Sequence, residues 1–128
     1  MNILYTNRLI LRPFKETDAQ AMYKNRTYDE PIGCIDLVGT NSYGVPEIGY
    51  VLAYDHRGKG IMTEAVKAAI DELFRCGFDK VGACHCVDNP ASGRVMEKCG
   101  MIYVRTCTAQ KKFGSDEQCE VKCYEISR

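Results

Sequence analysis

A glycine-rich turn at residues 55–60, with the sequence DHRGKG, is the segment whose residue types and spacing most clearly point to chemistry. Glycines at 58 and 60 allow backbone N–H groups to turn toward a common point. A strongly helical pattern follows at once, and the start of a helix adds the positive end of its dipole. Arg57 and Lys59 would bring positive charge to the mouth of the turn. The combination suits a pyrophosphate, although an ordinary strand-to-helix turn with surface charges would have the same pattern.

Two well-known phosphate-binding loops do not match this turn. The Walker pattern requires G-x-x-x-x-G-K followed by Ser or Thr, and here Lys59 is followed by Gly60. The dinucleotide-binding pattern G-x-G-x-x-G fails because position 63 is Thr. A phosphate bound at this turn is therefore expected to be held in another way.

The elements that must position the turn are those of a single mixed α/β domain over residues 1–128. Apolar residues recur at helical spacing after the turn, and Asn89-Pro90 is a typical helix start. We expect strands at about 8–14, 32–38, 47–54, 80–87, 101–109 and 119–126, with a hairpin joining the second and third. We expect helices from Thr17 or Asp18 to about Asn25, from the turn to Gly77, and from Asn89 to Gly100.

Composition excludes several classes of function. The 128 residues are 45% hydrophobic and carry 17 basic and 17 acidic side chains, so no basic excess favours nucleic acid. No apolar run approaches the roughly 18 residues of a membrane span, and the N-terminal stretch lacks the apolar segment of a signal peptide. Eight cysteines show no C-x-x-C pair, which favours reduced core thiols over a metal site. We expect a soluble cytoplasmic domain with no metal, nucleic-acid partner or membrane contact.

Four blocks, in the expected order and spacing, resemble the GNAT superfamily of N-acetyltransferases and, within it, the branch of ribosomal-protein N-acetyltransferases. They are residues 47–52 (EIGYVL), 57–65 (RGKGIMTEA), 89–92 (NPAS) and 96–101 (MEKCGM), and residues 6–14 (TNRLILRPF) resemble the first strand of that branch. The resemblance implies a GNAT-like mixed, mostly antiparallel sheet with helices on both faces. It also implies an acetyl-CoA-dependent N-acetyltransferase, in which a primary amine attacks the thioester directly in a ternary complex. The alternative is a catalytically degenerate coenzyme-A-binding protein of the same fold.

The same resemblance implies how coenzyme A is held. Backbone amides of the turn would bind the pyrophosphate, and the strand backbone at Tyr50 and Leu52 would pair with the pantetheine arm. The Leu52 N–H would polarise the thioester carbonyl, and the Asn89 side chain would bond the arm. This chain keeps both glycines of the family pattern Q/R-x-x-G-x-G/A, but it has Asp55 where the pattern has Gln or Arg. The implied cofactor-binding residues are Tyr50, Val51, Leu52, Arg57, Gly58, Lys59, Gly60, Ile61, Met62, Thr63, Asn89 and Ser92.

Resemblance also suggests the catalytic groups. Glu47 is the candidate base, acting through water on an amine that is already partly neutral, and the alternative is a carboxylate paired with a nearby cation. Ser92 is the candidate acid, and the alternative is a serine that satisfies a backbone N–H in the first helical turn. Tyr103 is a weaker acid candidate, and His85 is expected to be structural.

The chain departs from the family between its first helix and the strand at 32–38. Only residues 26–31 intervene, where family members have a second helix and a second strand. We therefore expect both elements to be missing, with the acceptor half abridged. The first and third strands could pair directly, a second subunit could cover the exposed edge in a homodimer, or an open groove could weaken catalysis. The acceptor stays undecided among protein N-termini, polyamines, aminoglycosides and amino acids.

Overall fold

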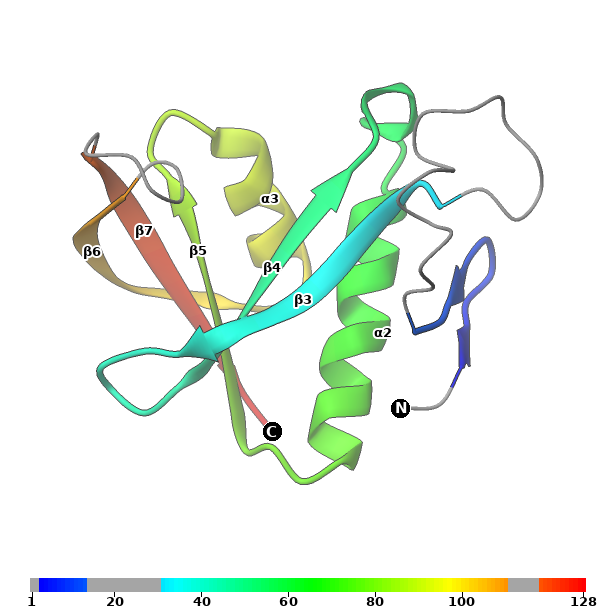
Figure 1. The fold of residues 1–128 in the computed structure, drawn as a ribbon, viewed down its shortest axis with the longest axis horizontal. Helices are drawn as coiled ribbons and strands as arrows, with labels where there is room; N and C mark the ends of the chain where they lie inside the picture. The colour runs from blue at the N-terminus through cyan, green and yellow to red at the C-terminus, as the bar shows by residue number, and fades with distance from the viewer. Residues whose placement is uncertain (1–2, 14–30, 111–117) are drawn as a thin grey trace.

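A five-stranded sheet forms the centre of the computed structural model, which describes residues 3–13, 31–110 and 118–128 (Figure 1). The strand order is β3-β4-β5-β7-β6, and only the β4–β5 pair is parallel. This mixed, mostly antiparallel sheet agrees with the expected fold class. The bounds are β3 (Gly33–Thr40), β4 (Pro46–Leu52), β5 (Lys80–Cys86), β6 (Ile102–Gln110) and β7 (Gln118–Ser127).

Two helices of the described residues, α2 (Ile61–Arg75) and α3 (Pro90–Lys98), pack on one face of this sheet. Their apolar stripes meet alternate residues of β5, Val81 and Ala83, which are both fully buried. A short 3₁₀ turn, η1 (Tyr54–His56), joins β4 to the start of α2. Two of the expected helices, the hairpin and the C-terminal strand pair are therefore confirmed.

The N-terminal segment differs from the expectation of one strand over 8–14. It forms a small hairpin of β1 (Leu4–Tyr5) and β2 (Ile10–Leu11), and the strand ends before Pro13, which has no N–H to extend a ladder. The described partner of β2 is β1 and that of β3 is β4, so the idea that the first and third strands pair directly is wrong for the described residues.

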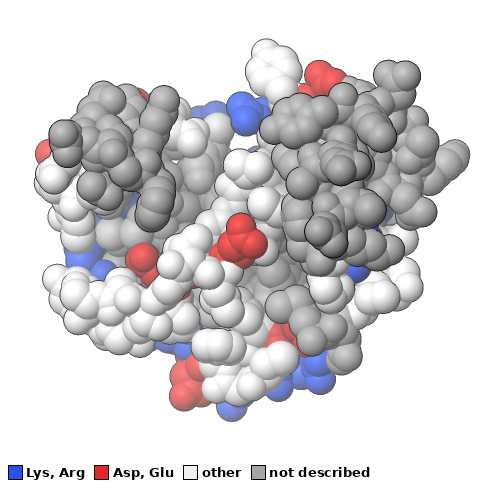
Figure 2. All heavy atoms as spheres, viewed as in Figure 1, with Lys and Arg blue, Asp and Glu red and all other residues white. Residues whose placement is uncertain are grey.

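Residues 14–30, which include the expected first helix and most of the connector before β3, lie outside the described residues. The expectations that helices cover both faces and that a second helix and strand are missing stay predictions. Strand β3 is an edge strand of the main sheet. A homodimer in which a second subunit covers this edge also stays a prediction. On the face shown in Figure 2, basic and acidic side chains are interspersed, without a large patch of one sign. Among the described residues, no helix is long and apolar enough to cross a membrane.

Strands β4 and β5 separate soon after they meet. Glu47 and Gly82 are the one residue pair in register between them, and beyond that pair the two strands diverge toward the starts of α2 and α3 (Figure 1). The carboxyl ends of both parallel strands lie at this side, and ligands of α/β sheets commonly bind outside such ends. We call this gap, lined by Ile48–Leu52 of β4 and Ala83–Cys86 of β5, the splay.

Candidate functional site

The glycine-rich turn lies at one end of the splay, where β4 passes through η1 into α2. Gly58 and Gly60 have φ angles of 77° and 73°, and Gly60 is the N-cap of α2. Those left-handed angles explain why the turn needs glycine. Within the described part of the chain, no N–H from Gly58 to Thr63 donates to another backbone group. The turn therefore presents a run of amides without a described backbone partner at the positive end of a 15-residue helix.

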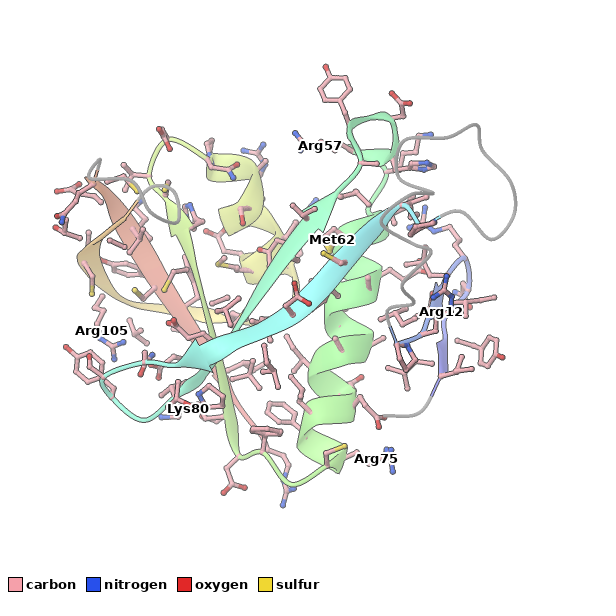
Figure 3. The ribbon with its side chains drawn as sticks, in the orientation of Figure 1. Arg12, Arg57, Met62, Arg75, Lys80 and Arg105 are labelled. Atoms are coloured by element: carbon pink, nitrogen blue, oxygen red, sulfur yellow. The ribbon has the colours of Figure 1, made fainter. Side chains whose placement is uncertain are left out.

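Three cations surround these amides, and one of them was not expected from the sequence. Nη1 of Arg8 donates to the carbonyl oxygen of Lys59 at 2.9 Å, and Nε of the same side chain pairs with Glu64 at 3.0 Å. Arg57 turns back toward β4, because its Nε donates to the Leu52 carbonyl oxygen at 3.2 Å, and Figure 3 shows this side chain beside η1. Lys59 is exposed. Nothing in the sequence pattern could have joined Arg8 to a turn some fifty residues further along.

The remaining predicted turn residues form the first turn of α2. Ile61 and Thr63 are half-buried, while Met62 is buried on the sheet side of the helix and belongs to the main core (Figure 3). Met62 therefore anchors the turn through packing, and its backbone N–H is the part of the residue open to a ligand.

Two backbone N–H groups of β4, those of Tyr50 and Leu52, point toward the splay. The N–H of Ala53 donates to the carbonyl oxygen of Ile32 at 2.7 Å, and hydrogen bonding alternates along an antiparallel pair. The same alternation makes Val51 bond to β3, whereas the N–H groups of Tyr50 and Leu52 point away from β3. The structure thus turns the two amides implied by the family resemblance into the splay. The side chain of Val51 is half-exposed, at 51%.

The start of α3 meets the other side of the splay. The Tyr50 hydroxyl donates to the carbonyl oxygen of Ser92 at 2.8 Å, and Oγ of Ser92 donates to that hydroxyl at 3.1 Å. Burial raises the pKa of Tyr50 to about 12, so the phenol stays protonated at neutral pH. Among the described residues, no backbone N–H is found donating to the Ser92 hydroxyl, so the alternative interpretation as a capping serine finds no support there, and its role as the acid stays a prediction. The sequence predicts a role for the Tyr50 backbone only, because nothing in it shows that the Tyr50 side chain meets the start of α3.

Asn89 stands at the N-cap position of α3, yet its side chain makes no capping hydrogen bond. It is exposed. An Asn at an N-cap usually bonds an amide of the first helical turn, and that bond stabilises the helix. The uncapped, exposed amide group is accordingly open to an external partner.

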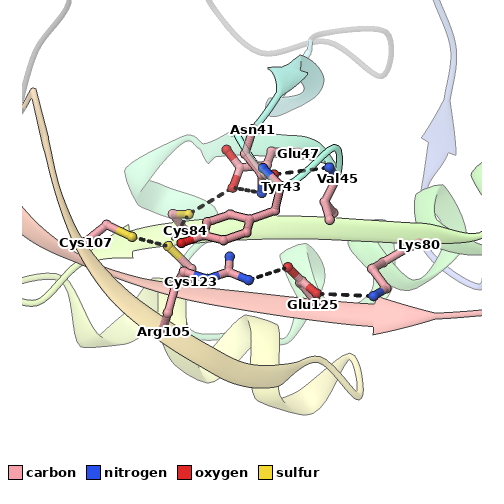
Figure 4. A network of polar contacts seen from close by, with 10 residues as sticks. All are labelled: Asn41, Tyr43, Val45, Glu47, Lys80, Cys84, Arg105, Cys107, Cys123 and Glu125. Carbon is pink, nitrogen blue, oxygen red and sulfur yellow. Dashed lines mark hydrogen bonds and ion pairs between the residues drawn. The ribbon is translucent and has the colours of Figure 1, made fainter.

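Glu47 lies on the sheet face opposite the helices, in the network of Figure 4. Its carboxylate accepts hydrogen bonds from Nδ2 of Asn41 at 3.3 Å and from Sγ of Cys84 at 3.2 Å. No lysine or arginine of the described residues forms an ion pair with it, so the alternative of a cation-paired carboxylate finds no support there. The carboxylate is half-buried beside the last β4–β5 pair, where the splay begins.

Three thiols extend this network across the sheet. Sγ of Cys84 lies 3.0 Å from Sγ of Cys123, which in turn lies 3.9 Å from Sγ of Cys107 (Figure 4). Burial, followed by the bonds to Cys123 and Glu47, raises the pKa of Cys84 well above its usual range. A thiol in this state is a poor nucleophile. All eight cysteines of the chain are free, and the described residues hold no cluster suited to a metal ion.

Tyr103 and His85, the two further residues weighed as catalytic candidates, both lie near the Tyr124 ring, with ring centroids 5.9 and 5.7 Å from it. Tyr103 is half-exposed on β6, and its hydroxyl shares a 2.6 Å hydrogen bond with Thr106. No contact of Tyr103 with the splay is found among the described residues. His85 is 8% exposed on β5 and faces α3.

Comparison with known proteins agrees with this geometry. The profile of the acetyltransferase (GNAT) domain family matches residues 24–102, which is more than half of the chain. The ribosomal-protein-serine acetyltransferase of Escherichia coli (strain K12) is 35% identical over 98 residues, covering 75% of this chain and 54% of that protein. The uncharacterised protein YkkB of Bacillus subtilis (strain 168) is 44% identical over 63 residues, or 48% of this chain and 37% of that protein. The chain spans about half, or less, of the length of these curated relatives.

Solved structures share the fold. A GNAT-family acetyltransferase from Bacillus anthracis superposes with a TM-score of 0.66 at 25% identity, over 77% of this chain and 60% of that one. The glycine turn before α2 and the parting of the parallel strands β4 and β5 agree with this family match. The named Escherichia coli relative also supports the ribosomal-protein N-acetyltransferase-like branch. The chain belongs to the GNAT acetyltransferase family.

Proposed function

We propose that this chain is an acetyl-CoA-dependent N-acetyltransferase domain that transfers an acetyl group to a primary amine within a ternary complex. The observation that carries the proposal is the splay, because β4 and β5 are in register only at Glu47 and Gly82, and the Tyr50 and Leu52 amides point away from β3 toward the side where the strands part. A pantetheine arm carries amide groups that can pair with such a strand edge. The amides of the glycine turn, which have no described backbone partner, lie where β4 passes into α2.

The glycine turn supports binding of the coenzyme A diphosphate. Amides from Gly58 to Thr63 offer donors, and the α2 dipole with Arg8 and Lys59 favours negative charge there. Each hydrogen bond to a charged group contributes about 1.5–3 kcal/mol. Several such bonds are enough for micromolar affinity once the losses on binding are included. The residues present therefore fit this cosubstrate.

The acyl-transfer step follows from groups on both faces of the splay. The amine nitrogen attacks the thioester carbon, and a C–N bond forms while the carbonyl oxygen gains negative charge. The Leu52 N–H is the donor for that oxyanion. Glu47 takes the amine proton through water, because Asn41 and Cys84 hold its carboxylate at the start of the splay.

Breakdown of the intermediate breaks the C–S bond and releases a thiolate. We assign its proton to the Ser92 hydroxyl, which in this structure donates to the Tyr50 hydroxyl oxygen at 3.1 Å and turns from it to the sulfur; water then returns the proton to Ser92. The raised pKa of Tyr50 keeps the phenol neutral at pH 7, and its hydroxyl holds the start of α3 through the Ser92 carbonyl oxygen. Asn89, with its side chain free of capping, bonds the pantetheine arm beside it.

We also propose that the domain works in the cytoplasm and without a metal. Its eight free thiols suit a reducing compartment. The named relative acts on a ribosomal protein, as its name states, and a spermidine N-acetyltransferase shares the fold. Both substrates present amines, so an amine acceptor is the coarse assignment that we carry over.

The proposal is tested by measuring thiol release from acetyl-CoA with a panel of amines and peptide N-termini. We expect saturable release with at least one acceptor. Glu47→Gln should lower the rate about 100-fold at pH 7, within the usual range for a lost general base. It should lower the rate less at pH 9, where an α-amine is already neutral. Glu120→Gln, an exposed carboxylate on β7, is the matched control and should leave the rate unchanged.

Two outcomes would contradict the proposal. If acetyl-CoA raises the melting temperature but no acceptor gives thiol release, the chain is a coenzyme-A-binding member without turnover. If acetyl-CoA at millimolar concentration neither raises the melting temperature nor gives heat in calorimetry, the assigned cosubstrate is wrong.

A further inference from the structure

Arg8 joins the N-terminal hairpin to the glycine turn. Nη1 of its side chain donates to the carbonyl oxygen of Lys59 at 2.9 Å, and Nε pairs with Oε1 of Glu64 at 3.0 Å. Lys59 belongs to the turn and Glu64 to the first turn of α2, so one guanidinium bonds to both where the hairpin lies beside α2 (Figure 1). A planar guanidinium holds its donors in a fixed fork, so two such bonds fix its orientation.

A separate set of contacts docks the hairpin on α2. Oε2 of Glu64 accepts hydrogen bonds from the Thr6 hydroxyl and, at 3.1 Å, from the backbone N–H of Arg8. Within the hairpin, Oγ1 of Thr6 accepts the N–H of Leu9 at 3.1 Å. These contacts do not involve Lys59. The bond from Arg8 to the Lys59 carbonyl oxygen is therefore additional to those that dock the hairpin.

That additional bond sets the direction of the next amide. In a trans peptide, the carbonyl oxygen of one residue and the N–H of the next point to opposite sides. The described residues contain no cis peptide bond, so the Gly60 N–H points away from the guanidinium that holds the Lys59 carbonyl oxygen. Glycine on either side of Lys59 gives this peptide unusual rotational freedom. Among the described residues, Arg8 is the one side chain found bonded to it.

We propose that Arg8 is a positioning residue for coenzyme A, because its hold on the Lys59 carbonyl oxygen keeps the Gly60 N–H turned toward the diphosphate. The inference rests on the proposed function, since it assumes that the amides of the glycine turn bind that diphosphate. Arg8 acts through the backbone of the turn and touches no reacting atom. A donor that is oriented before the ligand arrives adds affinity, since its ordering costs nothing at the moment of binding.

Two simpler roles would also place an arginine here. The first is positive charge near a phosphate, but the Arg8 side chain is 47% exposed, so water and salt screen a bare charge at this place. The second is docking of the hairpin, which the Thr6 hydroxyl and the Arg8 backbone N–H already provide. Neither role needs the bond to the Lys59 carbonyl oxygen, whereas a positioning role does.

The test is calorimetry with coenzyme A on the wild type, Arg8→Lys and Thr6→Val. Arg8→Lys keeps the charge but loses the fork that holds Glu64 and the Lys59 carbonyl oxygen together. It should weaken coenzyme A about 10-fold, the effect of one lost hydrogen bond to a charged group. This ratio should be the same at about 0.1 M and about 1 M salt, where the screening length falls from about 10 to about 3 Å. Thr6→Val removes the docking hydroxyl and should stay within about twofold of the wild type.

Each simpler role has its own result. If Arg8→Lys binds like the wild type, or if its deficit disappears at high salt, charge alone acts and the inference is wrong. If Arg8→Lys and Thr6→Val lose equal affinity, docking of the hairpin alone acts and the inference is again wrong. In these cases the wild type still binds coenzyme A, so the proposed function stands. If the wild type does not bind, the proposed function has failed and the inference falls with it.

A second measurement uses the wild type alone and holds even if a variant fails to fold. In ¹⁵N NMR spectra, we expect the Nε–H of Arg8 to exchange slowly with water before any ligand is added, because it is bonded to Glu64. On adding coenzyme A, the Gly60 amide proton should move downfield as it gains a hydrogen bond. An Arg8 Nε–H that exchanges as in an unfolded chain, or a Gly60 amide that stays unmoved while coenzyme A binds, would overturn the inference.

Discussion

Replacing Gly58 by alanine separates what the glycine turn contributes to folding from what it contributes to binding. Gly58 has a φ of 77°, and a Cβ built there meets no atom within 4 Å. The substitution is therefore free of clashes and costs only the left-handed backbone strain, about 1–2 kcal/mol. For a chain of this size, each 1 kcal/mol lowers the melting temperature by about 4 °C. We expect a fall of about 4–8 °C without ligand.

Gly44 provides a matched control for this substitution. It lies in the β3–β4 turn, away from the splay, has a φ of 80°, and likewise has no atom within 4 Å of a built Cβ. Gly44→Ala should therefore lower the melting temperature by the same amount as Gly58→Ala. Only Gly58→Ala should weaken coenzyme A, because alanine keeps its N–H but relief of the left-handed strain turns that amide away from the phosphate. The loss of one amide hydrogen bond to a phosphate, about 1.5–3 kcal/mol, corresponds to about 10- to 100-fold in affinity.

Scanning fluorimetry and calorimetry with coenzyme A measure the two effects on the same samples. Gly58→Asn is the informative third variant, because asparagine tolerates the left-handed conformation and should recover part of both losses. If Gly58→Ala and Gly44→Ala lose equal stability and both keep wild-type affinity, the amides of the turn do not hold the diphosphate. Equal losses of affinity would show a global effect and would refute the reasoning in the same way.

Three further predictions concern the groups around the site. Gly93→Ala should destabilise the protein by about 1–3 kcal/mol in denaturant titration, because its Cβ would lie 2.5 Å from Nε2 of His85; an unchanged midpoint would contradict that contact. The Thr6 hydroxyl, which donates to the Glu64 carboxylate, is the main reason why the pKa of Glu64 is lowered from 4.5. The stability that this carboxylate contributes is therefore present above pH 4.5 and is lost as the pH falls through the lower pKa of the folded state. A Glu64→Gln variant should lose this part of the acid dependence of the melting temperature. Tyr50→Phe removes the hydroxyl that bridges β4 and α3 and should cost about 1 kcal/mol of unfolding free energy, whereas a stability equal to the wild type would argue against the bridge.

The candidate site was predictable from the sequence where it depends on neighbours in the chain. The left-handed glycines, the helix that follows them and the Pro90 helix start are local features, and the structure has all of them. The N–H groups of Tyr50 and Leu52 point away from β3, as alternation along the strand requires, and their pairing with pantetheine stays a prediction. Local geometry repeats wherever the local residues repeat.

Other parts of the site could not be predicted, because they join residues far apart in sequence. Arg8 reaches the carbonyl of Lys59 across 51 positions, and the Cys84 thiol reaches Glu47 across 37. No periodicity or motif encodes such a pair, since each contact depends on how two finished elements pack. The opening strand was predicted too long for a similar reason. Its pairing depends on the β1 partner, and the apolar run at 8–14 alone does not reveal where that pairing ends.

The amino-acid sequence by itself determined the glycine turn, the amphipathic helix behind it and the alternation of the strands. These follow from left-handed backbone angles, from a 3.6-residue period and from a two-residue period, which short-range sterics impose on any chain. Only the tertiary structure decided that β4 and β5 part after Glu47 and Gly82, that Tyr50 meets Ser92, and that His85 is left with an unpaired nitrogen. The physical reason is that the width of the gap and the pairing of buried polar groups depend on the packing of α2 and α3 as whole elements against the sheet.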